Sequence, residues 1–196
     1  MNEWDRIIGA IDEYNLADPI SEVFEDETLK SEVVYSIRVT RWIQRLVESP
    51  SKELLVAARG AHIGRWEVPR KRYPEGLKGY YEWKTFLLKH HAEKVREILV
   101  LYKIDPITIT TITNIIMRKN LKENSDAQAL EDAVCLVFLE MQLLPLMTKT
   151  TEDKVINAIQ KTWKKMSLRG QEMALSIDLP NEAKQVIKKA LKHCSQ

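Results

Sequence analysis

The chain has 196 residues, of which 44% are hydrophobic and 30% are charged, and its formal net charge is +2. These values are ordinary for one globular domain and exclude disordered, collagen-like and coiled-coil classes. A charge of +2 is also too small to indicate a nucleic-acid partner by itself, because such binding needs many clustered phosphate contacts.

The cysteines and the apolar runs indicate in which cellular compartment the protein is expected. Cys135 and Cys194 lie far apart and resemble neither a disulfide framework nor a zinc motif, which favours a reduced, cytoplasmic protein. The N-terminus has no basic head before an apolar stretch, so it does not resemble a signal peptide. The uncharged apolar run over residues 133–139 is too short to span a bilayer. We therefore expect a soluble protein with no membrane partner.

Apolar residues at helical spacing predict three helices before residue 62. They cover residues 2–15, 31–48 and 51–60, with Tyr35 on the inward side of the second. Because the third runs into a glycine, His62 is placed near a helix C-terminus.

Prolines and glycines then predict a long ordered loop over residues 64–79, of the kind that often carries function. A long helix follows between about residues 80 and 98. His91 falls on its apolar face and His90 on its charged face, so the two adjacent histidines are expected in different surroundings.

The C-terminal half is also predicted to be helical. A helix is expected over 106–116 despite its β-branched residues, and another from Ser125 through the segment that ends at Met147. The second is apolar on every side, so it should be central and should carry Glu131 and Asp132 into the core. The last predicted helices cover 155–170 and 181–191.

These elements predict an all-α fold, a single compact multi-helix domain over residues 1–196 without a strand pair. The carboxylates of Glu131 and Asp132 would need partners in such a core. His62 and His91 are the best placed, and histidine with carboxylate on facing helices is a recurrent metal site. The alternative is structural: His91 makes one hydrogen bond, His62 caps a carbonyl, and the acids pair with Arg38, Arg65 or Arg118.

Two segments, VVYSIRVTRWIQRL and ELLVAARGAHIGRW, resemble the opening of an HD-domain metal-dependent phosphohydrolase, and LEDAVCLV resembles the helix with its last aspartate ligand. The resemblance implies an HD-like helical core over about 27–148, with C-terminal helices 151–193 packed on it. Asp132 matches the last ligand, but Tyr35 stands at the first histidine and Ala61-His62 at the His-Asp pair. It therefore implies a degenerate HD fold, in which a rebuilt site would use other ligands.

In that rebuilt site, we expect His62, His91 and Asp132 to hold a divalent metal, namely manganese, iron, nickel or magnesium. Glu131 and Asp132 are the expected catalytic residues. The metal would activate water against a phosphate ester.

Five segments, AHIGRWEVPRKRYPEG, GYYEWK, KHHAE, LEDAVCLVFLE and KTWKKMSLRG, resemble domain-of-unknown-function family 4202 over nearly the whole chain. A glutamine commonly precedes the histidine matched by His62 in that family, so Ala61 is a departure. The family carries no established activity to transfer.

Basic residues supply a candidate phosphate site. Arg65 and Arg70 flank Trp66 on the predicted loop, where guanidinium groups could bind phosphate oxygens and the ring a base, and Lys119 could join them. The alternative is a solvated surface on which Trp66 packs the loop against the core.

Two hypotheses remain open. The first is a metal-dependent phosphohydrolase acting on a nucleotide or a phosphate monoester. The second is a non-catalytic module that binds a nucleotide, RNA or a protein through a degenerate HD site. The sequence leaves the substrate and the oligomeric state open.

Overall fold

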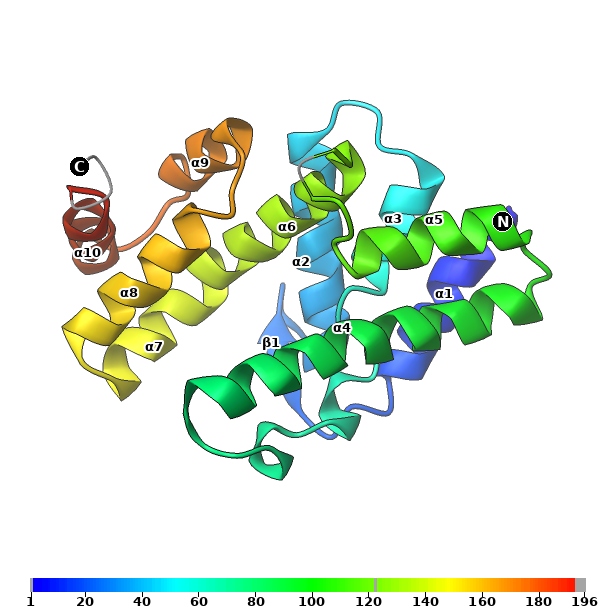
Figure 1. Cartoon of the computed structure of the whole chain (residues 1–196), viewed down its shortest axis with the longest axis horizontal. Helices are drawn as coiled ribbons and strands as arrows, with labels where there is room; N and C mark the ends of the chain where they lie inside the picture. The colour runs from blue at the N-terminus through cyan, green and yellow to red at the C-terminus, as the bar shows by residue number, and fades with distance from the viewer. Residues whose placement is uncertain (1, 122, 193–196) are drawn as a thin grey trace. The chain divides into compact units, whose positions relative to one another are not determined.

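The computed structural model describes residues 2–121 and 123–192, and it is helical apart from one two-stranded sheet (Figure 1). The predicted all-α class is therefore confirmed. The backbone divides into two compact units, Met1–Leu130 and Glu131–Gln196, which we describe separately. The single domain expected from the sequence stays a prediction, and Cys194 and residue 193 lie outside the described residues.

The first unit contains the elements α1 to α5 and the sheet, with two short 3-10 helices in the loop before α4. Their bounds are α1 Glu3–Asn15, β1 Ser21–Phe24, β2 Glu27–Lys30, α2 Ser31–Leu46, α3 Lys52–Arg59, η1 Arg65–Glu67, η2 Arg70–Arg72, α4 Gly76–Leu101 and α5 Pro106–Ile116.

Local capping explains where several of these helices begin. Asn2 and Asp5 form a reciprocal capping box at α1, and the Ser51 hydroxyl accepts the Leu54 amide at α3. At α5 the Asp105 carboxylate accepts two amides of the first turn. Helix α3 then packs against α1, α2 and α5, and α4 packs against α1 and α5, which closes the core.

The hairpin of β1 and β2 corrects the prediction that no strands pair. Its two-residue turn places Glu25 and Asp26 at φ 51° and 68°, where Asn-Gly or Asp-Gly is the usual sequence signal. Phe24 is its buried hydrophobic anchor, whereas Val23 is 76% exposed. The strands are four residues each and lack an alternating apolar pattern, so no local signal indicated them.

The segment from Gly64 to Gly79 is ordered, as predicted, through the two 3-10 turns. Trp83 anchors it from α4: its indole Nε1 donates to the Val68 carbonyl at 2.8 Å, and its ring packs with Val68, Tyr73 and Leu87. A small apolar cluster therefore fixes the loop on α4.

Helix α6, Ser125–Val137, contains the boundary between the units. The second unit continues with a π-helical turn η3 Phe138–Gln142 and with α7 Leu143–Lys149, α8 Glu152–Trp163, α9 Leu168–Leu175 and α10 Asn181–Lys192. Helix α8 packs against α7 and α10. No helix in the described ranges is long and apolar enough to cross a membrane.

The predicted helix over 155–170 is wrong at its end. Helix α8 stops at Trp163, and Ser167 begins α9 by accepting the Gly170 amide, so Gly170 lies inside a helix instead of ending one. The apolar spacing of α8 continues to the buried Met166 across the turn, which hid the break.

Candidate functional site

His62 lies in the turn after α3, where Tyr35 of α2 covers its ring. The two rings are parallel, with centroids 3.7 Å apart and an interplanar angle of 1°. Tyr35 is buried, but the His62 side chain keeps 22% of its surface exposed. Part of the His62 side chain is therefore accessible to solvent.

His91 projects from α4 into the core, as the sequence predicts, and only 1% of it is exposed. Its Nδ1 lies 2.7 Å from the Ile63 carbonyl oxygen. Because a carbonyl only accepts, Nδ1 carries the proton and Nε2 keeps its lone pair. The His91 and His62 ring centroids are 5.5 Å apart, so the two imidazoles form a pair.

Glu32, in the first turn of α2, completes this group. Its Oε2 lies 3.5 Å from Nδ1 of His62 and is buried without a hydrogen-bond partner in the described part of the chain. Burial raises the pKa of the Glu32 carboxyl to about 7, although the Arg65 guanidinium opposes the rise and the Asp18 carboxylate adds to it. Glu32 therefore exchanges its proton near neutral pH.

Three cations from different elements act electrostatically on the imidazole of His62. Burial lowers its pKa well below the usual value, and Arg65, Arg118 and Lys84 lower it further. The pKa of His91 is also lowered well below its usual value, first by burial and then by His62. Both imidazoles are therefore neutral at pH 7, and the field around His62 is positive.

Two of these cations connect the cluster to aromatic residues on α4. The Arg65 guanidinium lies over the Trp83 ring, 5.0 Å from its centroid, and the Lys84 ammonium lies 5.7 Å from the centroid of Tyr80. Tyr80 and its neighbour Tyr81 are 39% and 54% exposed. Exposed rings therefore stand next to the positive site.

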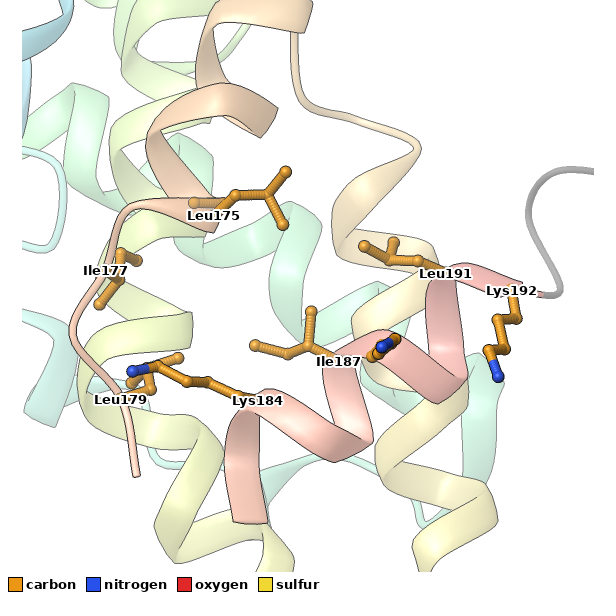
Figure 2. A pocket seen from close by; sticks show the side chains of 9 residues that line it. Leu175, Ile177, Leu179, Lys184, Ile187, Leu191 and Lys192 are labelled. Carbon is orange, nitrogen blue, oxygen red and sulfur yellow. The ribbon is translucent and has the colours of Figure 1, made fainter. Parts of the chain in front are cut away.

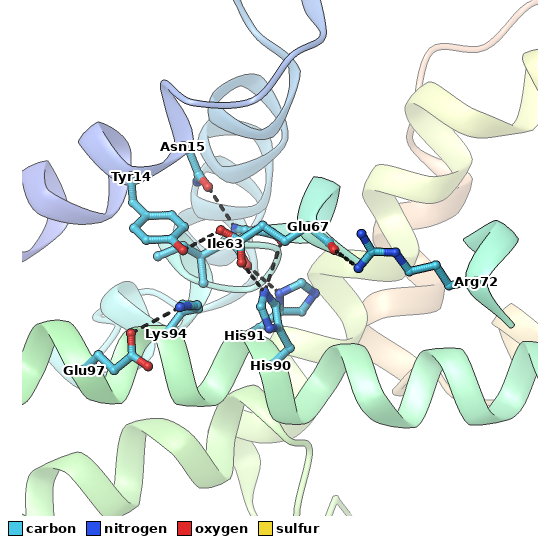
Figure 3. A network of polar contacts seen from close by, with 10 residues as sticks. Tyr14, Asn15, Ile63, Glu67, Arg72, His90, His91, Lys94 and Glu97 are labelled. Atoms are coloured by element: carbon cyan, nitrogen blue, oxygen red, sulfur yellow. Dashed lines mark hydrogen bonds and ion pairs between the residues drawn. The ribbon is translucent and has the colours of Figure 1, made fainter. Parts of the chain in front are cut away.

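A separate polar network holds the turn that carries His62 and Arg65 (Figure 3). The Glu67 carboxylate accepts the Tyr14 hydroxyl at 2.6 Å and lies 3.1 Å from Nε2 of His90. Gly64 adopts φ 66°, a conformation that favours glycine, and its amide donates to the side chain of Asn15. These contacts tie the turn to α1 and α4.

Asp132, in the second unit, is bound by the beginning of α9. Its carboxylate accepts the Ser167 amide at 2.8 Å and the Ser167 hydroxyl, and only 3% of Asp132 is exposed. A Cβ on Gly170 would stand 2.6 Å from Cγ of Asp132, so this position needs glycine. The segment KMSLRG thus supplies the serine and the glycine that hold a buried carboxylate.

Glu131 also contacts a residue of the second unit. Its Oε1 lies 3.3 Å from the Lys165 ammonium, and its side chain is 14% exposed. Lys165 is therefore one partner of Glu131, and the pairing of the acids with an arginine stays a prediction.

The remaining predicted binding residues differ in what they contact. The Arg70 guanidinium donates to the carbonyls of Tyr73 and Pro74, at 2.9 and 2.8 Å, and so closes the loop on itself. The Trp66 ring lies 6.0 Å from the Tyr14 ring, and Lys119 is exposed after α5. The roles of these residues as substrate contacts stay predictions. Among the predicted binding residues, Arg65 is the one whose charge lowers the pKa of His62.

The predicted metal ligands belong to both units: His62 and His91 to the first, and Asp132 to the second. Within the described residues, no group of three or more His, Cys, Asp and Glu side chains is arranged to hold a metal ion. We derive no chemical step through a metal, and the metal site stays a prediction.

Sequence reasoning missed Glu32, Lys84 and Tyr80. A signal existed for Glu32, because it lies one helical turn before Tyr35 and therefore on the same side of α2. Lys84 and Tyr80 share one face of α4 by the same spacing, but nothing local indicates that this face reaches His62.

Together, these features define an all-α protein with a stacked tyrosine and histidine pair, a buried carboxyl and converging cations in its first unit. The chain belongs to the family described as domain of unknown function DUF4202, whose profile matches residues 5–187. No curated protein matches the chain, and no solved structure matches it. The predicted family is therefore confirmed, whereas the HD resemblance is not.

Proposed function

We propose that the cluster around His62 binds the phosphoryl group of a nucleotide and hydrolyses its phosphate ester. The observation that carries this proposal is that Arg65, Lys84 and Arg118 act electrostatically on a partly exposed, neutral imidazole that lies 3.5 Å from the Glu32 carboxylate. A positive field at a partly exposed group favours an anion, and guanidinium groups match phosphate oxygens well.

The carboxyl of Glu32 is compatible with a bound phosphate. A carboxylate beside an anion would repel it, but the pKa of Glu32 is raised to about 7. In its protonated form Glu32 donates a hydrogen bond to a phosphate oxygen. The site therefore offers one O–H donor and several cationic donors to the same ligand.

The exposed tyrosines favour a nucleotide over a simple phosphate monoester. Lys84 lies near both His62 and the Tyr80 ring, so a phosphate at the cluster would place an attached nucleoside near α4. Aromatic rings stack on any base, with about 1–3 kcal/mol per stacked base. Tyr80 and Tyr81 are the rings available for this contact.

For hydrolysis, the pair of Glu32 and His62 supplies the two proton transfers. Water attacks phosphorus and gives a proton to an imidazole nitrogen of His62, while the P–O bond to the alcohol breaks. The leaving oxygen takes the proton of Glu32, and the imidazolium then returns its proton to the carboxylate. The Glu32 carboxyl, whose pKa of about 7 lies near the working pH, suits the role of proton donor in this exchange.

Binding is tested by thermal shift and calorimetry with a nucleoside monophosphate and with inorganic phosphate. Arg65→Gln and Lys84→Gln should each weaken both ligands by about ten- to a hundredfold, because each removes a charge-assisted hydrogen bond. Lys71→Gln and Lys89→Gln are matched controls on the same loop and the same helix, and both positions are exposed. Equal effects of the test and control variants would overturn the proposed site.

The Tyr80→Ala variant tests whether the ligand is a nucleotide or a simple phosphate monoester. It should weaken the nucleoside monophosphate and leave inorganic phosphate unchanged, because only the base needs the ring. An equal loss for both ligands would contradict the placement of the base on α4.

Hydrolysis is tested by phosphate release from nucleoside monophosphates at pH 7. Glu32→Gln and His62→Asn should abolish release while ligand-induced thermal shifts persist. If the unmodified protein binds the nucleotide without releasing phosphate, it is the non-catalytic module of the second hypothesis. If RNA binds more tightly than the nucleotide, the ligand of that module is a nucleic acid. Elemental analysis of untagged protein checks the predicted metal separately.

A further inference from the structure

The second unit contains a groove of about 450 Å³ that has no part in the proposed function (Figure 2). It lies between α9 and α10 and the segment that joins them. Its apolar lining consists of Ala174, Leu175, Ile177, Leu179, Ile187 and Leu191. Leu175 is 66% exposed at the edge of the groove, whereas Ala174, Leu179 and Ile187 are buried.

Lysines form the charged side of the same groove. Lys184, Lys188 and Lys192 line it and recur every four residues along α10. Residues four apart on a helix rise by about 6 Å, so the backbone positions of the three lysines span about 12 Å of α10. None of the described residues that line the groove is acidic.

The neighbouring lysine of α10 has a different role. Lys189 contacts Glu152 at 2.7 Å and does not line the groove, whereas Lys184 contacts Asp178 at 3.1 Å. Asp178 is fully exposed, so this pair is of the weakly stabilising kind and can be exchanged for another carboxylate. The row of lysines is therefore open to a new acidic partner.

We propose that this groove binds an amphipathic helix of a partner protein, with carboxylates four residues apart beside an apolar face. Such a helix repeats its acidic side chains at the spacing of the lysine row, and its apolar anchors fit an apolar groove between helices. A fatty acid carries one headgroup and would leave the rest of the row unpaired. Charge and spacing together favour the helix.

A fluorescent 14-residue synthetic peptide tests this proposal with the full chain. It carries leucine on one face and glutamate every four residues beside that face, and binding is followed by fluorescence anisotropy. We expect saturable binding that Lys188→Glu weakens by about tenfold or more and that rising salt weakens as well. Lys189→Glu, on the same helix but outside the groove, should bind as the unmodified protein does.

Two further arms make the proposal falsifiable. Leu175→Glu should also weaken the peptide, because it places charge on the apolar side of the groove; circular dichroism checks that both variants fold. A scrambled peptide of identical composition should bind at least about tenfold more weakly. Three results would overturn the proposed helix. They are equal binding of the scrambled peptide, an unchanged peptide affinity in Lys188→Glu, and displacement of the peptide by decanoate at equal concentration.

Discussion

Two buried acidic groups of this chain differ in how completely the fold satisfies them. In the second unit, Asp132 accepts the amide and the hydroxyl of Ser167, which fixes the beginning of α9. In the first unit, Glu32 has a buried oxygen without a hydrogen bond and a pKa raised to about 7. A satisfied carboxylate stabilises structure, whereas an unsatisfied one beside reachable groups is a candidate for chemistry.

The cations of the two units also differ in the groups that they face. Lys165 contacts Glu131 in the second unit, whereas Arg65 and Lys84 of the first unit act on a neutral histidine. The sequence placed all four acidic and imidazole groups in one site, which stays a prediction; the contacts described for the acids are with Ser167 and Lys165, whereas His62 stacks on Tyr35. The predictions below test that division, beginning with the largest expected effect.

Asp132→Ala should destabilise α9 by about 4 kcal/mol, because it removes two hydrogen bonds to a charged acceptor and leaves a buried amide unsatisfied. Hydrogen exchange of the α9 amides measures this change. Glu131→Gln is the neighbouring control and should cost at most about 1 kcal/mol, since its partner Lys165 is half-exposed. If Asp132→Ala lost nucleotide binding while its stability stayed unchanged, Asp132 would have a role in binding and not only in structure.

Glu32→Gln should change the pH dependence of stability by about 3 kcal/mol. The folded state holds the proton of Glu32 up to about pH 7, whereas the unfolded state loses it near 4.5. This contribution is therefore fully present below pH 4.5 and is lost as the pH rises through 7. Between pH 5 and pH 8, urea unfolding should show the variant gaining stability relative to the unmodified protein.

His62 and His91 act in the opposite direction, because their lowered pKa values cost stability as the pH falls below 6.5. Both histidines remain in Glu32→Gln, so the difference between the two proteins isolates the carboxyl. Parallel stability curves would show that Glu32 titrates normally and is not the unsatisfied group.

Trp83→Phe should loosen the loop that carries Arg65 by about 1–2 kcal/mol, because the buried Val68 carbonyl loses its donor. Limited proteolysis between Gly64 and Gly79 should become faster. Tyr81→Phe, which changes an exposed ring on the same helix, should have no effect. Unchanged proteolysis in Trp83→Phe would mean that other contacts hold the loop.

Most helices could be predicted because their apolar spacing and their caps are local. Asn2, Ser51 and Asp105 each cap the helix that the sequence placed behind them. The hairpin has no such signal, since Glu25 and Asp26 are unusual residues for its turn. The break before α9 was missed because the apolar spacing of α8 continues to Met166, although Ser167 is a local cap that accepts the Gly170 amide.

The site was predictable only in part, for a similar reason. His91 on the apolar face of α4 and Tyr35 on the inward face of α2 follow from helical spacing. Which carboxyl stands beside His62 depends on how α2 and α3 pack, and spacing within one helix does not contain that information. Glu32 is therefore a carboxyl beside His62 that helical spacing did not indicate, and the site roles of Glu131 and Asp132 stay predictions.

The most direct test of the central claim is nitrogen NMR of the chain labelled at its four histidines. On addition of a nucleoside monophosphate at pH 7, the ring nitrogens of His62 should shift and those of His90 should not, because His90 belongs to the Glu67 network. Arg65→Gln should reduce the shift at equal ligand concentration. Unchanged His62 resonances at saturating nucleotide and phosphate would contradict a phosphoryl site at this cluster.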